Sequence, residues 1–276
     1  MNTIKNIFII LIIALPTSFL AQNGNKYGET ENEQILCKEA LSVYKSYNKQ
    51  KNYSEAYQQW EKACDVCPDS VQESLYSHGA LFLKNEIKDA DQAGDETRKA
   101  VLIDSLMWVY DMRMELFPST TKKPKNRCGV LGRAASDFYK FNKDSAEVAF
   151  EMFKESIECL EAKSSASVLS GYYVTSFYTM KAINKIDKVA GLKRKAGMLT
   201  DYLMLMEYCN TAIAVAEEAG KERDLKGYVM AKANIEKTFI AIAQCDDMVP
   251  VLQASVKADP EKLELKKKVL SLLTNR

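Results

Sequence analysis

Apolar residues recur every three or four positions from residue 33 almost to the end of the chain, and no stretch alternates as a half-buried strand does. This spacing predicts an all-α protein of antiparallel helix pairs joined by short turns. The predicted pairs are 33–49 with 54–66, 71–87 with 95–117, 129–141 with 145–160, 166–186 with 192–219, and 225–243 with 248–257. One more helix, 261–273, has no partner, so we expect about five and a half hairpins.

Turn and capping residues separate these apolar stripes. Ser54 and Ser145 lie where a helix N-cap is expected, because a short hydroxyl side chain can accept a hydrogen bond from a free amide of the first turn. Pro68 ends the second helix, and Gly94 lies in the turn of the second pair. Residues 22–32 are polar and contain glycine, which predicts a short flexible lead-in.

Small and aromatic residues at fixed spacing mark the first pair. Trp60 follows Ala56 by four residues, Ala63 and Pro68 come three and then five residues later, and Tyr47 precedes Ala56 by nine. These spacings resemble the tetratricopeptide repeat (TPR), a helix–turn–helix unit of about 34 residues. The resemblance implies a right-handed superhelical solenoid over residues 33–276, because such a unit buries its apolar face only against neighbouring units.

The chain is also similar to secreted TPR-like proteins of Bacteroidota. The similarity rests on a cysteine-containing first hairpin and on three segments: LIDSLMWVYDMRMELFP at 102–118, GVLGR at 129–133 and CDDMVPVLQASVKADP at 245–260. Members of this group often continue with further repeats, which favours a truncated chain over a capping helix at 261–273. Their functions are mostly unassigned, so the resemblance implies a fold and lineage without naming a ligand.

The first 21 residues have the organisation of a secretory signal. Lys5 supplies the positive start, residues 7–15 form an apolar run, and Pro16 and Ala21 precede the expected cut. The run is shorter than the roughly 20 apolar residues that span a bilayer, which makes an uncleaved anchor the weaker alternative. We therefore expect an exported protein of the periplasm or of the periplasmic face of the outer membrane.

Charge and hydropathy narrow the class of partner. The chain has 38 Lys and Arg against 37 Asp and Glu. An evenly mixed charge argues against nucleic acid, which requires a basic face. No second apolar run of membrane length occurs, so no transmembrane span is expected after signal removal. The expected partner is another protein or peptide of the cell envelope, and the oligomeric state stays open.

Seven cysteines in an exported chain predict disulfides with at least one thiol left over. Cys37 opens one helix of the first pair, whereas Cys64 and Cys67 close its antiparallel partner. Cys37 is therefore expected to bridge either Cys67 or Cys64, and a Cys67–Cys128 bridge between pairs is a further alternative. The remaining cysteines are mostly expected to be small buried apolar residues: Cys128, Cys159, Cys209 and Cys245.

Motifs for catalysis, metal binding and cofactor binding are missing from the sequence. His78 is the only histidine, which excludes sites built on two histidines, and no nucleophile elbow, phosphate loop or dinucleotide fingerprint occurs. The pair Cys64 and Cys67 closes a helix, where the dipole opposes a thiolate, whereas redox pairs open one. We expect no enzyme, no cofactor and no metal; a thiol–disulfide enzyme is a remote alternative.

In TPR arrays the first helix of each pair lines the concave surface. Setting that register from Tyr47, Gly79 and Gly132 in the first three pairs gives six candidate groove residues: Leu41, Lys45, Tyr76, Leu83, Arg133 and Asp137. Leu41 occupies a position where TPR domains that clamp chaperone carboxylates need a lysine, which argues against that ligand. Three mid-helix glycines are expected to mark close helix approach, because glycine otherwise costs about 1 kcal/mol against alanine there: Gly79, Gly132 and Gly171.

The function expected from these features is a non-catalytic protein- or peptide-binding scaffold of the bacterial cell envelope. The alternative from a different class is a helical carrier or sensor that holds a small molecule or glycan between its helices.

Overall fold

The computed structural model describes residues 25–119 and 126–243, together with the isolated positions 257, 267, 270 and 271. Every regular element in these stretches is helical. The order is α1 (Glu31–Lys49), α2 (Tyr53–Val66), α3 (Glu73–Ala93), α4 (Glu96–Leu116), α5 (Asn126–Phe141), α6 (Ala146–Leu160), the 3-10 turn η1 (Glu161–Lys163), α7 (Ala166–Ile186), α8 (Lys188–Glu218) and α9 (Glu222–Ile242).

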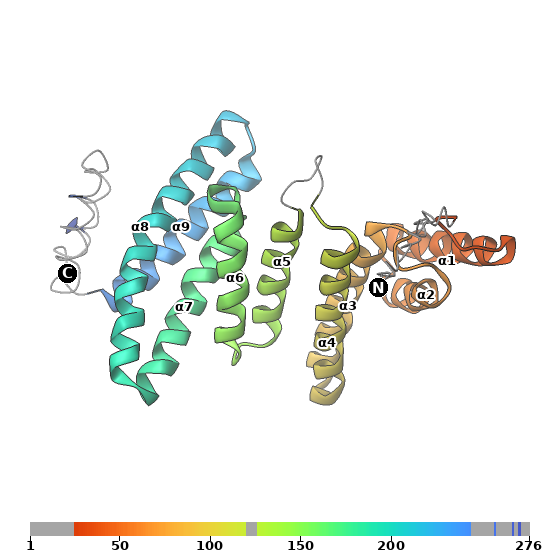
Figure 1. The fold of residues 1–276 in the computed structure, drawn as a ribbon, viewed down its shortest axis with the longest axis horizontal. Coiled ribbons are helices and arrows are strands. Elements are labelled where there is room, and N and C mark those ends of the chain that lie inside the picture. Colours follow the sequence, from red (N-terminus) through yellow and green to blue (C-terminus); the bar gives the residue numbers. More distant parts are fainter. Residues whose placement is uncertain (1–24, 120–125, 244–256, 258–266, 268–269, 272–276) are drawn as a thin grey trace, which may run out of the picture.

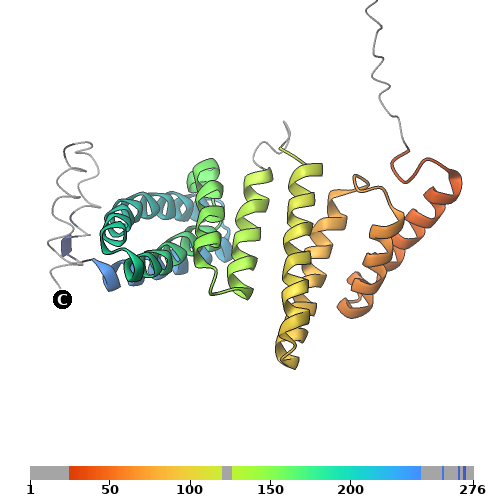
Figure 2. The same cartoon turned by 60° about the horizontal axis from the view of Figure 1, so that its bottom comes forward.

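Consecutive helices pack as the antiparallel pairs α1/α2, α3/α4, α5/α6 and α7/α8, and α9 packs on both α7 and α8. The pairs follow one another along the longest axis of an elongated molecule (Figure 1). Figure 2 shows α5 and α6 between the first four helices and α7–α9, with the α1/α2 pair inclined to its neighbours. The predicted pairing is thus confirmed for α1–α8. The expected partner of α9, 248–257, and the helix 261–273 lie almost entirely outside the described residues.

The N-terminal boundary differs from the flexible lead-in predicted for 22–32. Thr30 caps α1: its side chain accepts a hydrogen bond from the amide of Glu33 (3.3 Å). The Glu33 carboxylate in turn accepts from the amides of Glu29 and Thr30 (2.9 Å each). This reciprocal capping box joins residues 29 and 30 to α1, which begins at Glu31, two residues before the predicted start at 33.

Two further helix ends were misplaced by the sequence pattern. α3 runs past its predicted end at residue 87 to Ala93, and Gly94 takes the left-handed conformation (φ 70°) that closes a helix. α8 begins before its predicted start at residue 192, because the side chain of Asp187 caps it by accepting from the amides of Val189 (2.8 Å) and Ala190 (3.0 Å).

The buried side chains form two clusters along the array. The N-terminal cluster fills α1–α4 and extends to Val130 and Ala134 of α5. The C-terminal cluster begins at Ala135 of the same helix and continues through α6–α9. Phe138 and Met152, which are partly buried, pack against both clusters. The α5/α6 pair therefore joins the two cores.

Close helix contacts confirm the expectation for the mid-helix glycines. A Cβ atom added to Gly79 would lie 2.3 Å from Cζ2 of Trp60, and one added to Gly171 would lie 2.4 Å from Cζ of Phe153. A Cβ on Gly132 would lie 2.6 Å from the hydroxyl of Ser156. These distances are too short for any real side chain, so each glycine is required by the helix that packs on it.

The predicted repeat signature lies in the core of the first pair. Ala56, Trp60 and Ala63 are buried, Tyr47 is partly buried against the same cluster, and Pro68 follows the end of α2. The indole of Trp60 also donates a hydrogen bond to the carbonyl of Leu75 (2.8 Å) across the α2–α3 junction. The aromatic side chain therefore ties the first pair to the second.

Two disulfides close the first and third pairs. Cys37 and Cys67 join α1 to the end of α2, and Cys128 and Cys159 join α5 to α6. The first bridge confirms one of the two predicted partners of Cys37. The second corrects the interpretation of Cys128 and Cys159 as buried apolar residues, and it excludes a Cys67–Cys128 bridge. Cys64 and Cys209 are thiols, and Cys245 lies outside the described residues.

The disulfides and glycines repeat at nearly one interval, which the sequence pattern alone did not reveal. Cys37 precedes Cys128 by 91 residues, Trp60 precedes Phe153 by 93, and Gly79 precedes Gly171 by 92. Each member of these couples has the same role in its half of the chain. Helices α1–α4 and α5–α8 are therefore two copies of one two-pair pattern.

Candidate functional site

Three of the six predicted groove residues are core residues, and that part of the prediction is wrong. Leu41, Tyr76 and Leu83 are 3%, 1% and 0% exposed. Helix α3 is covered by α2 on one side and by α4 on the other, so its apolar positions face helices and no open surface. Lys45 is half-buried and donates a hydrogen bond to the side chain of Gln72 (2.9 Å).

The other two candidates, Arg133 and Asp137, lie together on α5 near the junction with α4. The carboxylate of Asp137 accepts a hydrogen bond from the hydroxyl of Tyr110 (2.6 Å) and pairs with the Lys84 ammonium (2.9 Å). The Arg133 residue is exposed to solvent, but surrounding protein atoms partly desolvate its guanidinium, and this desolvation together with the charge of Arg113 lowers its pKa. Asp137 is thus engaged in holding α5 to α3 and α4.

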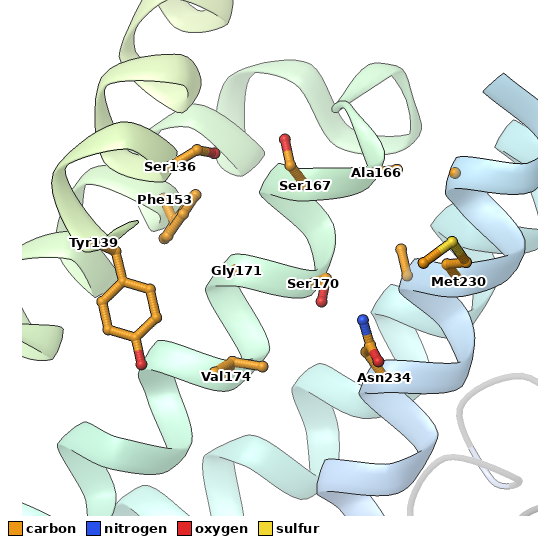
Figure 3. A pocket seen from close by; sticks show the side chains of 12 residues that line it. Ser136, Tyr139, Phe153, Ala166, Ser167, Ser170, Gly171, Val174, Met230 and Asn234 are labelled. Atoms are coloured by element: carbon orange, nitrogen blue, oxygen red, sulfur yellow. The ribbon is translucent and has the colours of Figure 1, made fainter. Parts of the chain in front are cut away.

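The structure places a different hollow between α5, α6, α7 and α9. Its volume is about 520 Å³. Figure 3 shows Tyr139 of α5 on one side and Met230 and Asn234 of α9 on the other, with α7 between them. We call this hollow the α5–α7–α9 groove, and its lining residues are Ser136, Tyr139, Phe153, Ala166, Ser167, Ser170, Gly171, Val174, Gly227, Met230, Ala231 and Asn234.

Small side chains create the groove. Ser170 and Gly171 on α7 and Ala231 on α9 line the hollow, and a Cβ added to Gly227 would be in van der Waals contact with Ala166 of α7 (3.5 Å). The two helices therefore approach closely at one end of the groove, while short side chains leave space along the rest. Small residues spaced three and four apart share one helix face, which is the sequence signal that could have located this surface.

The groove has no charged lining residue. Ser136 is turned onto its own helix, where its hydroxyl donates to the carbonyl of Gly132 (2.9 Å). Tyr139 lies beneath the Lys143 ammonium (4.2 Å to the ring centroid), and burial raises the pKa of its phenol, which stays protonated at neutral pH. Asn234 is exposed at the rim. The groove offers apolar contact with a few neutral hydrogen-bonding groups.

A second hollow, of about 530 Å³, lies between α6, α7 and α8 around Arg194. The guanidinium pairs with Asp201 (3.1 Å), bonds to Ser176 and lies 4.4 Å from the ring centroid of Phe150. Tyr172 donates to the same carboxylate (2.8 Å). These groups neutralise and hold one another, so their arrangement is that of an internal polar network between helices.

Cys64 and His78 have the properties of packed structural residues. Burial raises the pKa of Cys64 to about 12, and the nearby charge of Asp65 adds to the rise, so the thiol is protonated and weakly nucleophilic at neutral pH. Its CxxC partner, Cys67, is bonded to Cys37. His78 lies against Tyr44, and burial lowers its pKa.

Within residues 25–119 and 126–243 no group of three potential ligands from His, Cys, Asp and Glu is placed to hold a metal ion. No helix of these stretches is both long and apolar enough to cross a membrane. Comparison with known proteins adds no relative: no protein-family model, no curated protein and no solved structure matches the chain.

Proposed function

We propose that the protein is a non-catalytic scaffold of the bacterial cell envelope that binds a protein or peptide segment in the α5–α7–α9 groove. On this proposal its helix pairs form a right-handed TPR-like solenoid. The observation that carries the proposal is the groove itself, a hollow of about 520 Å³ that residues of α5, α6, α7 and α9 line together. A surface shared by several repeats is how stacked helix pairs bind extended ligands.

The chemistry of the groove suits an uncharged segment of peptide. Short side chains on α7 leave room for a backbone to approach, while Ser170 and Asn234 supply neutral hydrogen-bonding groups for its amides. Tyr139 and Met230 flank the hollow with adaptable apolar surface, and both residue types are enriched in protein-binding sites.

The exported location proposed for the scaffold is supported by two independent features. Residues 1–21 have the pattern of a secretory signal. The disulfides Cys37–Cys67 and Cys128–Cys159 form and persist in oxidising compartments and are rare in reducing ones. The periplasm, or the periplasmic face of the outer membrane, meets both conditions.

The alternative, a carrier or sensor of a small molecule or glycan, would use the same groove. Its volume falls within the range of about 300–1,000 Å³ typical of small-molecule pockets. The remote alternative, a thiol–disulfide enzyme, is disfavoured by the raised pKa of Cys64 and by the bond between Cys67 and Cys37.

Site-specific photo-crosslinking tests the scaffold proposal in the exported chain. A benzoylphenylalanine at Asn234, on the groove rim, is expected to give discrete protein adducts in cells, and Ser170→Trp in the same chain should remove them by filling the groove. The matched control carries the crosslinker at Ala214, an exposed residue of α8 outside the groove. If Asn234 gives no protein adduct and native mass spectrometry finds a bound small molecule, the carrier replaces the scaffold.

A further inference from the structure

The turn between α7 and α8 carries three large apolar side chains in full contact with solvent. Ile186, Val189 and Leu192 are 90%, 78% and 61% exposed. Residues 184–189 are exposed without interruption, and the turn lies at the lower edge of the molecule in Figure 1. We call residues 181–195 the α7–α8 tip. Large apolar side chains this exposed at one place mark an interaction site.

Positive charge surrounds these apolar residues. Five lysines and one acidic residue, Asp187, fall within 181–195, besides Arg194, which is paired with Asp201, although the whole chain has a formal net charge of only +1. Lys181, Lys185, Lys188 and Lys193 are exposed. The acidic residue caps α8, so its charge is partly offset by the helix amides it accepts from. The even mixing of charge expected for this chain therefore fails at the tip.

The fold does not require this composition, as the equivalent turn of the first half shows. Asp95 caps α4 by accepting from the amide of Arg98 (2.9 Å), as Asp187 caps α8. With these two caps aligned, the positions of the three apolar tip residues are occupied in the α3–α4 turn by Gly94, Thr97 and Ala100, and the position of Lys188 is occupied by Glu96. The corresponding positions of the first half therefore hold no bulky apolar side chain, and the two cations near its cap, Arg98 and Lys99, are paired with Glu86 and Asp91.

We propose that the α7–α8 tip inserts Ile186, Val189 and Leu192 into the surface of an anionic lipid bilayer while its lysines contact the lipid headgroups. Apolar side chains at the apex of a hairpin can enter the interfacial region of a bilayer, and lysines beside them bind anionic lipid and extend their charged ends to the headgroups. The basic charge selects a negatively charged surface, and the narrow apex favours insertion over the broad contact that a second folded chain would need.

This inference is independent of the groove. Ile186, at the apex of the tip, lies twelve residues beyond Val174, the last groove residue on α7, which corresponds to about 18 Å along the axis. A bilayer bound at the tip would therefore leave the α5–α7–α9 groove open, and the crosslinking result at Asn234 does not decide between the presence and absence of lipid binding.

Vesicle flotation tests the proposal with the chain purified after export, because the apolar run at 7–15 would itself bind lipid. The vesicles are phosphatidylcholine alone or phosphatidylcholine with about one third phosphatidylglycerol, at about 0.1 M salt. We expect flotation with the anionic vesicles only. A triple variant that copies the residues of the α3–α4 turn should lower the partition coefficient at least about tenfold. Its three changes are Ile186→Gly, Val189→Thr and Leu192→Ala.

A second variant, Lys185→Gln with Lys188→Glu, tests the charge and should lower partitioning roughly tenfold. The matched control is Val101→Thr with Val215→Thr, which removes exposed apolar side chains from α4 and α8 outside the tip and should leave flotation unchanged. Circular dichroism melting, unchanged in all variants, shows that they fold. The proposal is overturned if the native chain floats with neither vesicle, if the control loses as much as the tip variants, or if the apolar triple variant floats like the native chain.

Discussion

Single residues decide how closely the helix pairs stack. Gly79 and Gly171 hold equivalent positions in the two halves of the chain, and each lies under the aromatic ring of the preceding helix, Trp60 or Phe153. The aromatic ring buries a large apolar area, which makes each contact a major source of stability between pairs. At these two positions glycine lowers the intrinsic stability of its own helix, but it allows the helix pairs to pack closely.

Gly79→Ala is expected to lower the free energy of unfolding by about 1–3 kcal/mol, because its Cβ would lie 2.3 Å from the Trp60 ring and force the helices apart. The matched control is Gly129→Ala, whose Cβ would meet only the end of the Arg133 side chain at 4.0 Å. That change should be neutral or stabilising by up to about 1 kcal/mol. Urea denaturation measures both, and equal effects at the two positions would contradict the packing role.

The residues whose role could be predicted from the sequence are those that depend on spacing within a single helix pair. The positions of Ala56, Trp60 and Ala63 on one face, and the need for glycine at 79, follow from helical periodicity within a pair. The groove could not be predicted in this way, because its residues were placed by the inner-face register of TPR units rather than by the contacts of this fold. In the structure that face is turned towards neighbouring helices at Leu41, Tyr76 and Leu83.

At the scale of the helix pair, the disulfides occur in the two pairs with the shortest second helices among the four. α2 has 14 residues and α6 has 15, and each is joined to the first helix of its pair by a bridge that closes a loop of 30 or 31 residues. The α3/α4 and α7/α8 pairs have longer helices. Covalent closure thus supplements packing where the packed length is least.

Removing the first bridge with Cys37→Ala and Cys67→Ala is expected to lower the free energy of unfolding by about 3 kcal/mol, because the open loop regains conformational entropy in the unfolded chain. The loss should appear first in amides of α1 and α2, which have a neighbouring pair on one side only within the described residues. Hydrogen exchange read by mass spectrometry locates it. Cys64→Ala is the matched control, since its thiol has no bridge; a comparable loss there would contradict the assignment.

At the scale of the whole molecule, the chain is a linear array with two cores that meet in the α5/α6 pair. Contacts between helices are formed mainly with sequence neighbours, so we expect stability to behave as a sum of local terms and interface terms. Equivalent cysteines, aromatics and glycines of the two halves are separated by a near-constant 91–93 residues, which indicates that the arrangement of the first four helices is repeated. The two halves pack their helices in the same way. They differ at the two places for which a function is proposed, the α5–α7–α9 groove and the α7–α8 tip.

Equal truncations in the two cores test this organisation. Leu83 and Leu205 are both fully buried, one in each cluster, and either change to alanine should cost about 2–5 kcal/mol. Leu83→Ala is expected to reduce amide protection in α1–α4 much more than in α7–α9, and Leu205→Ala to do the reverse. Hydrogen exchange under native conditions measures both halves in one sample.

Among the described residues, Phe138 is one of two that pack against both cores, and replacing it tests how strongly the cores are coupled. Phe138 packs against both clusters, so Phe138→Ala should weaken their coupling and make the protection of each half less sensitive to a Leu→Ala change in the other. If Leu83→Ala instead lowered protection equally from α1 to α9, the molecule would unfold as one cooperative unit. The two halves would then be a repeat in sequence only, and binding at the groove or the tip would stabilise the distant core as strongly as its own.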